Sequence, residues 1–452
     1  MKAGTLVLVV AALAAVAFGY LLAFEPNVAA VAVIVFIGGV VFAAVGWKMR
    51  RPGDAAWLPR WIMIGFVAKV AGTIARYLMV TVVYHEGLGD SYQYYRAGVS
   101  IAEAFANGEA LVTTGYASFG TQVLEMITGG FFIVFTPDFL GGFMMFTCFA
   151  FAGQIMFYAA FRRWAEPTQL KPYAILIFLL PTYAFWPSSI GKDAIVVFCL
   201  GGAAYFIARL LDRYEFKWVL ALAPFVLLLG LVRIHIAALV VAAMLGTTII
   251  ATARGKPDLM RTFRRFAIIG VSAAAGLVAL RLFPDIFGFD FSSTEGVDTF
   301  AADVVRRTSK SGTIAEGGAV TSPLDVPGAI ALALFRPWIL EANEIQHYFA
   351  ALETTLLAGL TLWRLRAMIG NWRSWRSNAY LVFCTIYVLG FSIAFSVIRN
   401  LGIIARQRGQ ILALFLVIIC AMGLPAKREE RTAVPQVPAP PPPTPSPALT
   451  RP

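Results

Sequence analysis

Hydrophobic residues in this chain form long runs separated by short polar segments. A helix needs about 20 apolar residues to cross a bilayer, with some tolerance for shorter ones. Twelve segments qualify: Thr5–Phe24, Ala29–Trp47, Trp61–Tyr84, Leu140–Phe161, Pro172–Trp186, Asp193–Leu211, Trp218–Val232, Ile236–Ala253, Phe266–Phe283, His347–Trp363, Asn378–Ile398 and Ile411–Pro425. The pattern predicts an all-α polytopic membrane protein with about 12 transmembrane helices. The first is expected to be a retained helix, because a second span follows it at once.

Lysine and arginine gather in loops that this topology places on one side of the membrane. The clusters are Lys48–Arg51, Arg162–Arg163, Arg209–Lys217, Arg254–Arg265, Arg364–Arg376 and Lys427–Arg428. By the positive-inside rule that side is cytoplasmic, and an even number of spans puts both termini there. The long segments 85–139 and 284–346 then face the outside of the cell membrane.

One further apolar run, Gln122–Phe135, would reverse every later loop if it crossed the membrane. It contains Glu125 and a pair of glycines. We therefore expect an interfacial or re-entrant helix on the outer face, within a set of amphipathic juxtamembrane helices. Three regions follow: two N-terminal helices with a basic cytoplasmic loop (1–60), a membrane module (61–425) and a proline-rich, disordered cytoplasmic tail (426–452).

Composition supports this class and narrows the partners. Hydrophobic residues make up 59% of the 452 residues and charged residues only 14%, which is typical of polytopic membrane proteins. The net charge of +12 lies in the loops, so we expect membrane lipids and no nucleic acid as partners. Cys148, Cys199, Cys384 and Cys420 are too scattered for a CxxC metal site. No metal ligand is assigned, although a divalent metal remains compatible with the sequence.

The most informative polar stretch follows the third predicted span. Asp90 there is suited to take a proton from an acceptor hydroxyl, and Arg96 is suited to hold a phosphate. Tyr92, Tyr94 and Tyr95 offer ring faces with a hydroxyl at the membrane interface. The alternative interpretation is an ordinary aromatic belt beside a solvated aspartate.

Polar residues within or between other spans add candidates, because such groups at membrane depth are costly. Lys69 and Arg76 share one face of a span, and Lys69 needs a partner or a cavity. Lys192 is suited to bind a phosphate group. Asp193 is suited to the first turn of the helix that follows, where an acidic side chain is favourable. A simple turn with a cap explains the same pair. The predicted outer hairpin carries Arg233 and His235, where the histidine is structural or catalytic.

Positive charge on the outer side runs against the orienting rule, which makes Arg336, Arg399, Arg406 and Arg408 notable. Solvation at the surface also explains Arg399, which lies beside Asn400. An arginine fork fits a phosphate or pyrophosphate. With Lys192 and Arg96, these arginines would line a pocket for an anionic lipid headgroup. Two acids, Glu341 and Glu344, follow Arg336 in the chain. Of these we predict that Glu341 contributes to substrate binding.

An acid opening the loop after a span, with tyrosines behind it, resembles the GT-C superfamily of integral-membrane glycosyltransferases. The matching stretch is Gly89-Asp90-Ser91-Tyr92-Gln93-Tyr94-Tyr95-Arg96. Segment Pro181–Asp193 is similar to a pattern of bacterial members, and the Phe335–Trp338 and Asn400–Gly402 elements look like a poorly characterised bacterial branch. The resemblance follows motif order over Trp61–Pro425, with two extra helices before it and one acid where many members have a pair.

This resemblance implies a polyprenyl-phosphate sugar as donor, a glycan or lipid as acceptor, and inverting transfer with Asp90, in apolar surroundings, as the base. Arginine and lysine would hold the donor phosphate. Candidates for a second acid are Glu86, Glu103, Asp193, Glu341 and Glu344. Two other functions fit the pattern: a polysaccharide polymerase or ligase that relies on outer arginines and His235, and a lipid-linked glycan flippase or transporter.

Overall fold

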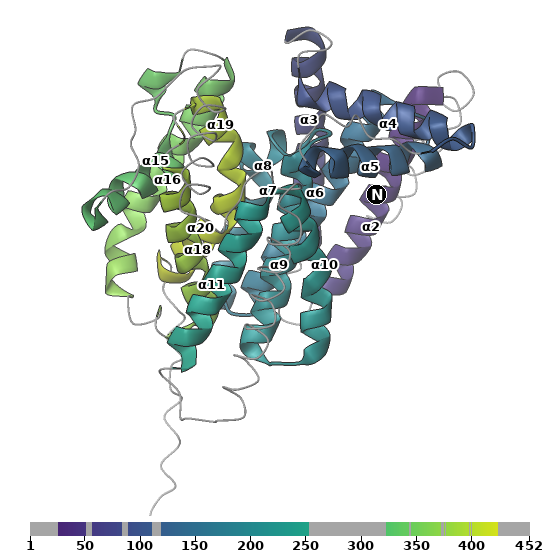
Figure 1. Ribbon diagram of the computed structural model, residues 1–452. Helices are drawn as coiled ribbons and strands as arrows, with labels where there is room; N and C mark the ends of the chain where they lie inside the picture. The colour runs from purple at the N-terminus through teal and green to yellow at the C-terminus, as the bar shows by residue number, and fades with distance from the viewer. Residues whose placement is uncertain are drawn as a thin grey trace, which may run out of the picture.

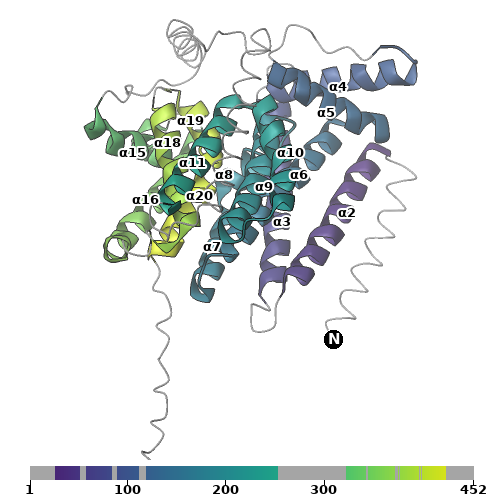
Figure 2. The same cartoon turned by 60° about the horizontal axis from the view of Figure 1, so that its bottom comes forward.

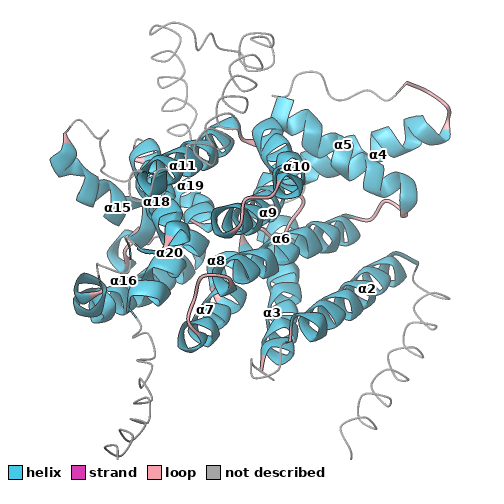
Figure 3. Ribbon diagram, turned by 90° about the horizontal axis from the view of Figure 1, so that it is seen from below, coloured by secondary structure: helices cyan, strands magenta, loops and turns pink. Residues whose placement is uncertain are grey.

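The computed structural model describes residues 26–50, 57–83, 89–110, 119–252, 322–342, 345–371, 375, 377–396, 398 and 400–423. Within these ranges the secondary structure consists of helices joined by loops (Figure 3), which confirms the all-α class. Several predicted parts lie outside the described residues. They are the spans Thr5–Phe24 and Phe266–Phe283, residues 284–321 of the second outer segment, Arg399 and the tail 426–452.

Four described helices are long and apolar enough to cross a membrane. They are α2 (Pro26–Met49), α3 (Leu58–Leu78) with its π-helical continuation η1 (Met79–Val83), α6 (Phe139–Arg162) and α9 (Lys192–Asp212). A fifth span results if α19 (Leu401–Gln407) and α20 (Gly409–Gly423), bent by 56° at their junction, count as one. The structure thus supports a membrane protein with four or five candidate spans; the count of twelve is not confirmed.

Other predicted spans form helices that do not meet these length and hydropathy requirements. They are α10 (Phe216–Val232), α11 (Ile234–Thr252), α16 (Ile345–Gly370) and α18 (Ala379–Phe395). The second long polar segment contributes η2 (Pro323–Asp325), α15 (Val326–Phe335) and η3 (Ile339–Glu341). Figure 2 shows α2 and α3 at one side of the bundle and α15 and α16 at the other.

Helices α6 and α9 pack together at the centre of the bundle through small residues. A Cβ added to Gly201 of α9 would lie 2.3 Å from the Gly153 carbonyl of α6. This backbone approach is typical of membrane helix pairs, in which close packing replaces the hydrophobic effect. Around this pair, α4 (Asp90–Ala106) and α5 (Phe119–Val134) run across the end of the bundle (Figure 1). The α5 helix forms where the interfacial or re-entrant segment was predicted.

The predicted span Pro172–Trp186 is wrong as a continuous helix. It starts earlier and is broken into α7 (Pro167–Leu179) and α8 (Pro181–Phe185). The reason is Pro181, which has no N–H to continue the helix. The Ile177 carbonyl, which that N–H would have reached, instead accepts from Gln154 Nε2 of α6 at 2.5 Å.

Helix α3 packs closely against α8 at a glycine, which generates a test of the fold. A Cβ on Gly72 would lie 2.0 Å from the Ala184 carbonyl, whereas a Cβ on Gly359 of α16 would meet nothing within 4 Å. We expect Gly72→Ala to lower the free energy of unfolding by about 1–3 kcal/mol through overpacking. The control Gly359→Ala should leave stability unchanged or raise it. Thermal unfolding in detergent, followed by tryptophan fluorescence, measures both; equal midpoints would contradict this packing.

Candidate functional site

The candidate site begins with Asp193 in the first turn of α9, as the sequence predicted. Its side chain is only 9% exposed and is paired with two arginines from different parts of the chain. Arg233 Nη2, at the junction of α10 and α11, donates to Asp193 Oδ1 at 2.8 Å. Arg406 Nε of α19 donates to Asp193 Oδ2. This clamp occupies both carboxylate oxygens, so Asp193 is poorly suited to act as a base.

Asp90 lies on the open side of the same cluster. Arg406 Nη1 is 3.3 Å from Asp90 Oδ2, so one guanidinium joins Asp90 to Asp193. The Asp90 side chain is 60% exposed, so it is not buried among other side chains of the protein. An acid of this kind remains accessible to a reactant, in contrast to the buried Asp193.

Lys192 completes the positive side of the cluster. It is half-buried at the start of α9 and interacts electrostatically with Asp90, Arg233 and Arg406. Three cations thus surround two carboxylates. One nitrogen of the cluster, Arg233 Nη1, is buried without a hydrogen-bond partner among the described residues. We call Asp90, Lys192, Asp193, Arg233 and Arg406 the Asp90–Asp193 cluster.

The three predicted tyrosines separate into two roles. Tyr94 is buried below Asp90, and burial together with the nearby carboxylate raises its pKa to about 12. Its hydroxyl therefore stays protonated. Tyr92 and Tyr95 pack their rings 5.9 and 5.0 Å from Phe139 at the start of α6. These contacts hold α4 against the bundle. Packing alone therefore explains why aromatic residues stand at positions 92 and 95.

Other predicted site residues take no part in the ion pairs that join Asp90, Asp193, Arg233 and Arg406 among the described residues. Arg96 is exposed on α4, two residues past the buried Tyr94 and so on another side of the helix. His235 lies at the edge of the cluster: its side chain is exposed, with its ring 5.5 Å from that of Phe395, and it interacts electrostatically with Arg233 and Lys192. Arg336 pairs with Glu341, its Nε 2.9 Å from Oε1. Arg96, Arg336 and Arg406 therefore have different surroundings and do not line the one common pocket that was expected.

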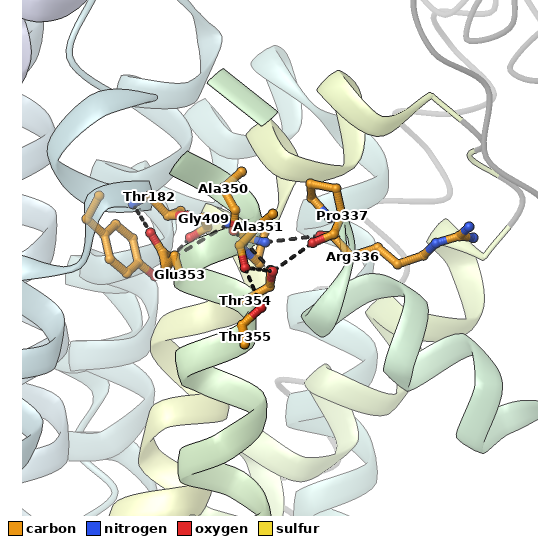
Figure 4. Close-up of polar contacts among 11 residues, drawn as sticks. Thr182, Arg336, Pro337, Ala350, Ala351, Glu353, Thr354, Thr355 and Gly409 are labelled. Carbon is orange, nitrogen blue, oxygen red and sulfur yellow. Dashed lines mark hydrogen bonds and ion pairs between the residues drawn. The ribbon is translucent and has the colours of Figure 1, made fainter. Parts of the chain in front are cut away.

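Another predicted arginine, Arg408, belongs to a second polar group that is buried between helices. Figure 4 shows Glu353 and Thr182 of this group. Arg408 Nη2 is 3.7 Å from Glu353 Oε1 of α16, and both side chains are at most 1% exposed. Sequence reasoning gave no role to either Glu353 or Thr182. An acid within the apolar run of α16 and a proline after α7 were the available signals.

The two intramembrane cations named from the sequence also find partners. Lys69 is 1% exposed and donates to the Tyr183 and Pro187 carbonyls, the latter at 3.4 Å. This confirms that Lys69 needs a partner at depth. Arg76 lies over the rings of Phe185 and Trp186, at 5.2 and 5.1 Å. Both cations therefore pack against α8 and the turn after it.

In chemical terms, the Asp90–Asp193 cluster combines an accessible carboxylate with a surplus of positive charge. Guanidinium and ammonium groups in a partly buried site bind phosphate oxygens well. The described residues contain no group of three His, Cys, Asp or Glu side chains that would hold a metal ion. The arrangement suits an anionic group beside a hydroxyl that loses a proton.

The two acids of the cluster should differ sharply in their effect on stability. Asp193→Asn leaves Arg233 buried without its counter-charge, which typically costs about 3–5 kcal/mol. Asp90→Asn removes only an exposed partner of Arg406, worth at most about 1 kcal/mol. Thermal unfolding of the purified variants measures this difference. Equal destabilisation by the two substitutions would contradict the clamp at Asp193.

Comparison with protein-family models, with curated proteins and with solved structures gives no match for this chain.

Proposed function

We propose that the protein is a membrane glycosyltransferase of the GT-C kind, which moves a sugar from a polyprenyl-phosphate donor to a glycan or lipid acceptor. The observation that carries the proposal is the position of Asp90. It is an exposed acid 3.3 Å from Arg406, within a cluster that holds two further cations. A base for the acceptor and a phosphate-binding surface for the leaving group thus lie side by side.

In the proposed reaction, the donor phosphate lies against Arg406 and Lys192. The acceptor hydroxyl oxygen attacks the anomeric carbon and its proton passes to Asp90. The bond between that carbon and the phosphate oxygen breaks, and the polyprenyl phosphate leaves with the electron pair. Configuration at the sugar carbon inverts, because attack and departure occur on opposite faces. Arg406 and Lys192 stabilise the charge that develops on the leaving oxygen.

Arg406 links donor binding to the activation of Asp90. Its Nη1 contact with Asp90 is long and exposed, whereas its Nε is committed to the buried Asp193. A donor phosphate would compete with Asp90 for Nη1 while the Nε contact keeps the guanidinium in place. Donor binding thereby frees the Asp90 carboxylate to accept the acceptor's proton.

Other candidates for a second acid are less suitable in this arrangement. Glu103 is on the same helix as Asp90 but about 20 Å along its axis, at 1.5 Å per residue. Glu341 is paired with Arg336, and Asp193 is held by two arginines. Glu86 and Glu344 lie outside the described residues. A single carboxylate therefore carries the proposed chemistry, and the leaving phosphate needs no protonation.

The proposed topology has the cluster on the extracytoplasmic face, with twelve spans and both termini cytoplasmic. Support comes from the position of α4 and α5 across one end of the bundle (Figure 1), next to Asp90. Juxtamembrane helices of this kind are what the resemblance to GT-C enzymes implies after the acidic motif. The donor would then enter laterally from the outer leaflet.

The test is transfer of a labelled sugar from polyprenyl phosphate by the purified protein in lipid. Asp90→Asn should lower the rate at least about 100-fold, the usual contribution of a general base, while the protein remains folded. Glu103→Gln is the matched control, since it removes a carboxylate from an exposed position of the same helix. Full activity of Asp90→Asn would contradict the role of Asp90 and favour a polymerase or ligase that uses the arginines.

A second candidate function, translocation of a lipid-linked glycan, is favoured by one observation. Two broken helices, α7–α8 and α19–α20, meet at buried Arg408, which donates to Thr182 at 3.0 Å. Transporters commonly bind their substrates at discontinuous helices. Flipping of a fluorescent polyprenyl-phosphate sugar in vesicles, together with an absence of sugar transfer, would support this function over the first.

A further inference from the structure

Two helix breaks far apart in the sequence are joined by direct hydrogen bonds. The first separates α7 from α8 before Pro181, and the second bends α19 against α20 at Arg408. Tyr183 Oη of α8 donates to the Gly409 carbonyl at 2.9 Å, and Arg408 Nη2 donates to Thr182 Oγ1 at 3.0 Å. Tyr183 thus holds the backbone of the second break, and Arg408 holds the first break through the Thr182 side chain.

Glu353 of α16 connects both breaks. Its Oε2 accepts from the Thr182 N–H at 2.6 Å (Figure 4). Its Oε1 lies 3.7 Å from Arg408 Nη2. Arg408 Nη1 also donates to the Arg336 carbonyl at 3.1 Å. That segment is in turn fixed to α16, because Thr354 Oγ1 donates to the Pro337 carbonyl at 2.8 Å. Every partner of the Arg408 guanidinium is therefore itself anchored.

Burial of this ion pair is hard to explain by stability alone. Removing two charges from solvent is expensive, and well-packed neutral side chains are often as stable. The pair is also incomplete: Glu353 Oε1 and Arg408 Nε have no hydrogen-bond partner among the described residues. A charged pair retained under these conditions is better explained by the geometry that it imposes.

That geometry concerns Arg406. Helix α19 has seven residues, and its first turn is capped by Asn400, whose Oδ1 accepts from the Ile403 N–H at 3.0 Å. Arg408 terminates the same helix, two residues after Arg406. So short a helix has little stability of its own. Its orientation depends on what holds its two ends.

We propose that the Glu353–Arg408 pair positions α19 so that Arg406 bridges Asp90 and Asp193, and thereby sets the affinity for the donor phosphate. This inference rests on the proposed function for the identity of the ligand. Glu353 and Arg408 are positioning residues, since they contact the two helix breaks and the Arg336 carbonyl and not the Asp90–Asp193 cluster.

The experiment compares wild type with Glu353→Gln, Arg408→Gln and the double variant. Each single change leaves one buried charge unpaired and should destabilise the protein, whereas the double variant leaves none and should fold. If the double variant does not fold, Arg408→Lys replaces it, because this change keeps the charge but loses the fork to Thr182 and Arg336. Thr355→Val is the control, since that hydroxyl bonds only the Ala351 carbonyl of its own helix.

Two quantities are measured on the folded variant. Hydrogen exchange of the α19 amides should become roughly tenfold faster, with α6 and α9 unchanged, because at least one charged hydrogen bond holding the helix is lost. The Kd for a polyprenyl monophosphate should rise roughly tenfold, the value of one such bond. A purely structural defect would reduce the amount of folded protein without changing this Kd.

Unchanged α19 exchange in a folded variant would overturn the inference. So would faster exchange with an unchanged Kd, because Arg406 would then not depend on the pair. If the wild type binds no polyprenyl monophosphate, the proposed function fails. The exchange measurement then decides on its own whether Glu353 and Arg408 hold α19.

Discussion

The break at Pro181 is the constraint on which the arrangement of the bundle depends. In a hydrocarbon environment every backbone polar group needs a partner inside the protein, and proline removes a donor from the middle of an apolar run. Side chains of other helices provide the partners: Gln154 of α6 donates to the Ile177 carbonyl, and Glu353 of α16 accepts from the Thr182 N–H. Lys69 of α3 donates to the nearby Tyr183 carbonyl, whose partner in a continuous helix would be another proline, Pro187. Each of these side chains is 2% exposed or less. One broken helix thus collects polar groups from helices distant in the sequence.

This collection of polar groups connects the interior to the end of the bundle. Glu353 is shared between the α8 backbone and Arg408, and Arg408 ends the short helix that presents Arg406. Arg406 then links the buried Asp193 to the exposed Asp90. A buried network of hydrogen bonds and ion pairs thus leads to an accessible pair of opposite charges, which is the arrangement that the proposed function requires of a site held in place before its substrate arrives.

The sequence predicted the helical class, most of the described helices and the residues of the Asp90–Asp193 cluster. It did so because apolar runs are long and because charges near membrane depth are rare enough to stand out. It did not predict which charges meet. Arg406 and Arg408 are two residues apart, yet one reaches Asp193 and the other Glu353, because the chain bends between α19 and α20. Likewise, Pro181 explains why Pro172–Trp186 is divided into two helices. That Gln154 would donate to the Ile177 carbonyl left open there depends on tertiary packing, which the sequence does not show.

The most direct test of the account is to locate a bound donor. A polyprenyl phosphate with a photoreactive group next to the phosphate would be cross-linked to the protein in lipid, and the adducts mapped by mass spectrometry. The account predicts adducts on the first turns of α4 and α9 and on α19, with excess unlabelled polyprenyl phosphate preventing them. Adducts confined to α16 and to the break between α7 and α8 would contradict it and place the ligand between the broken helices.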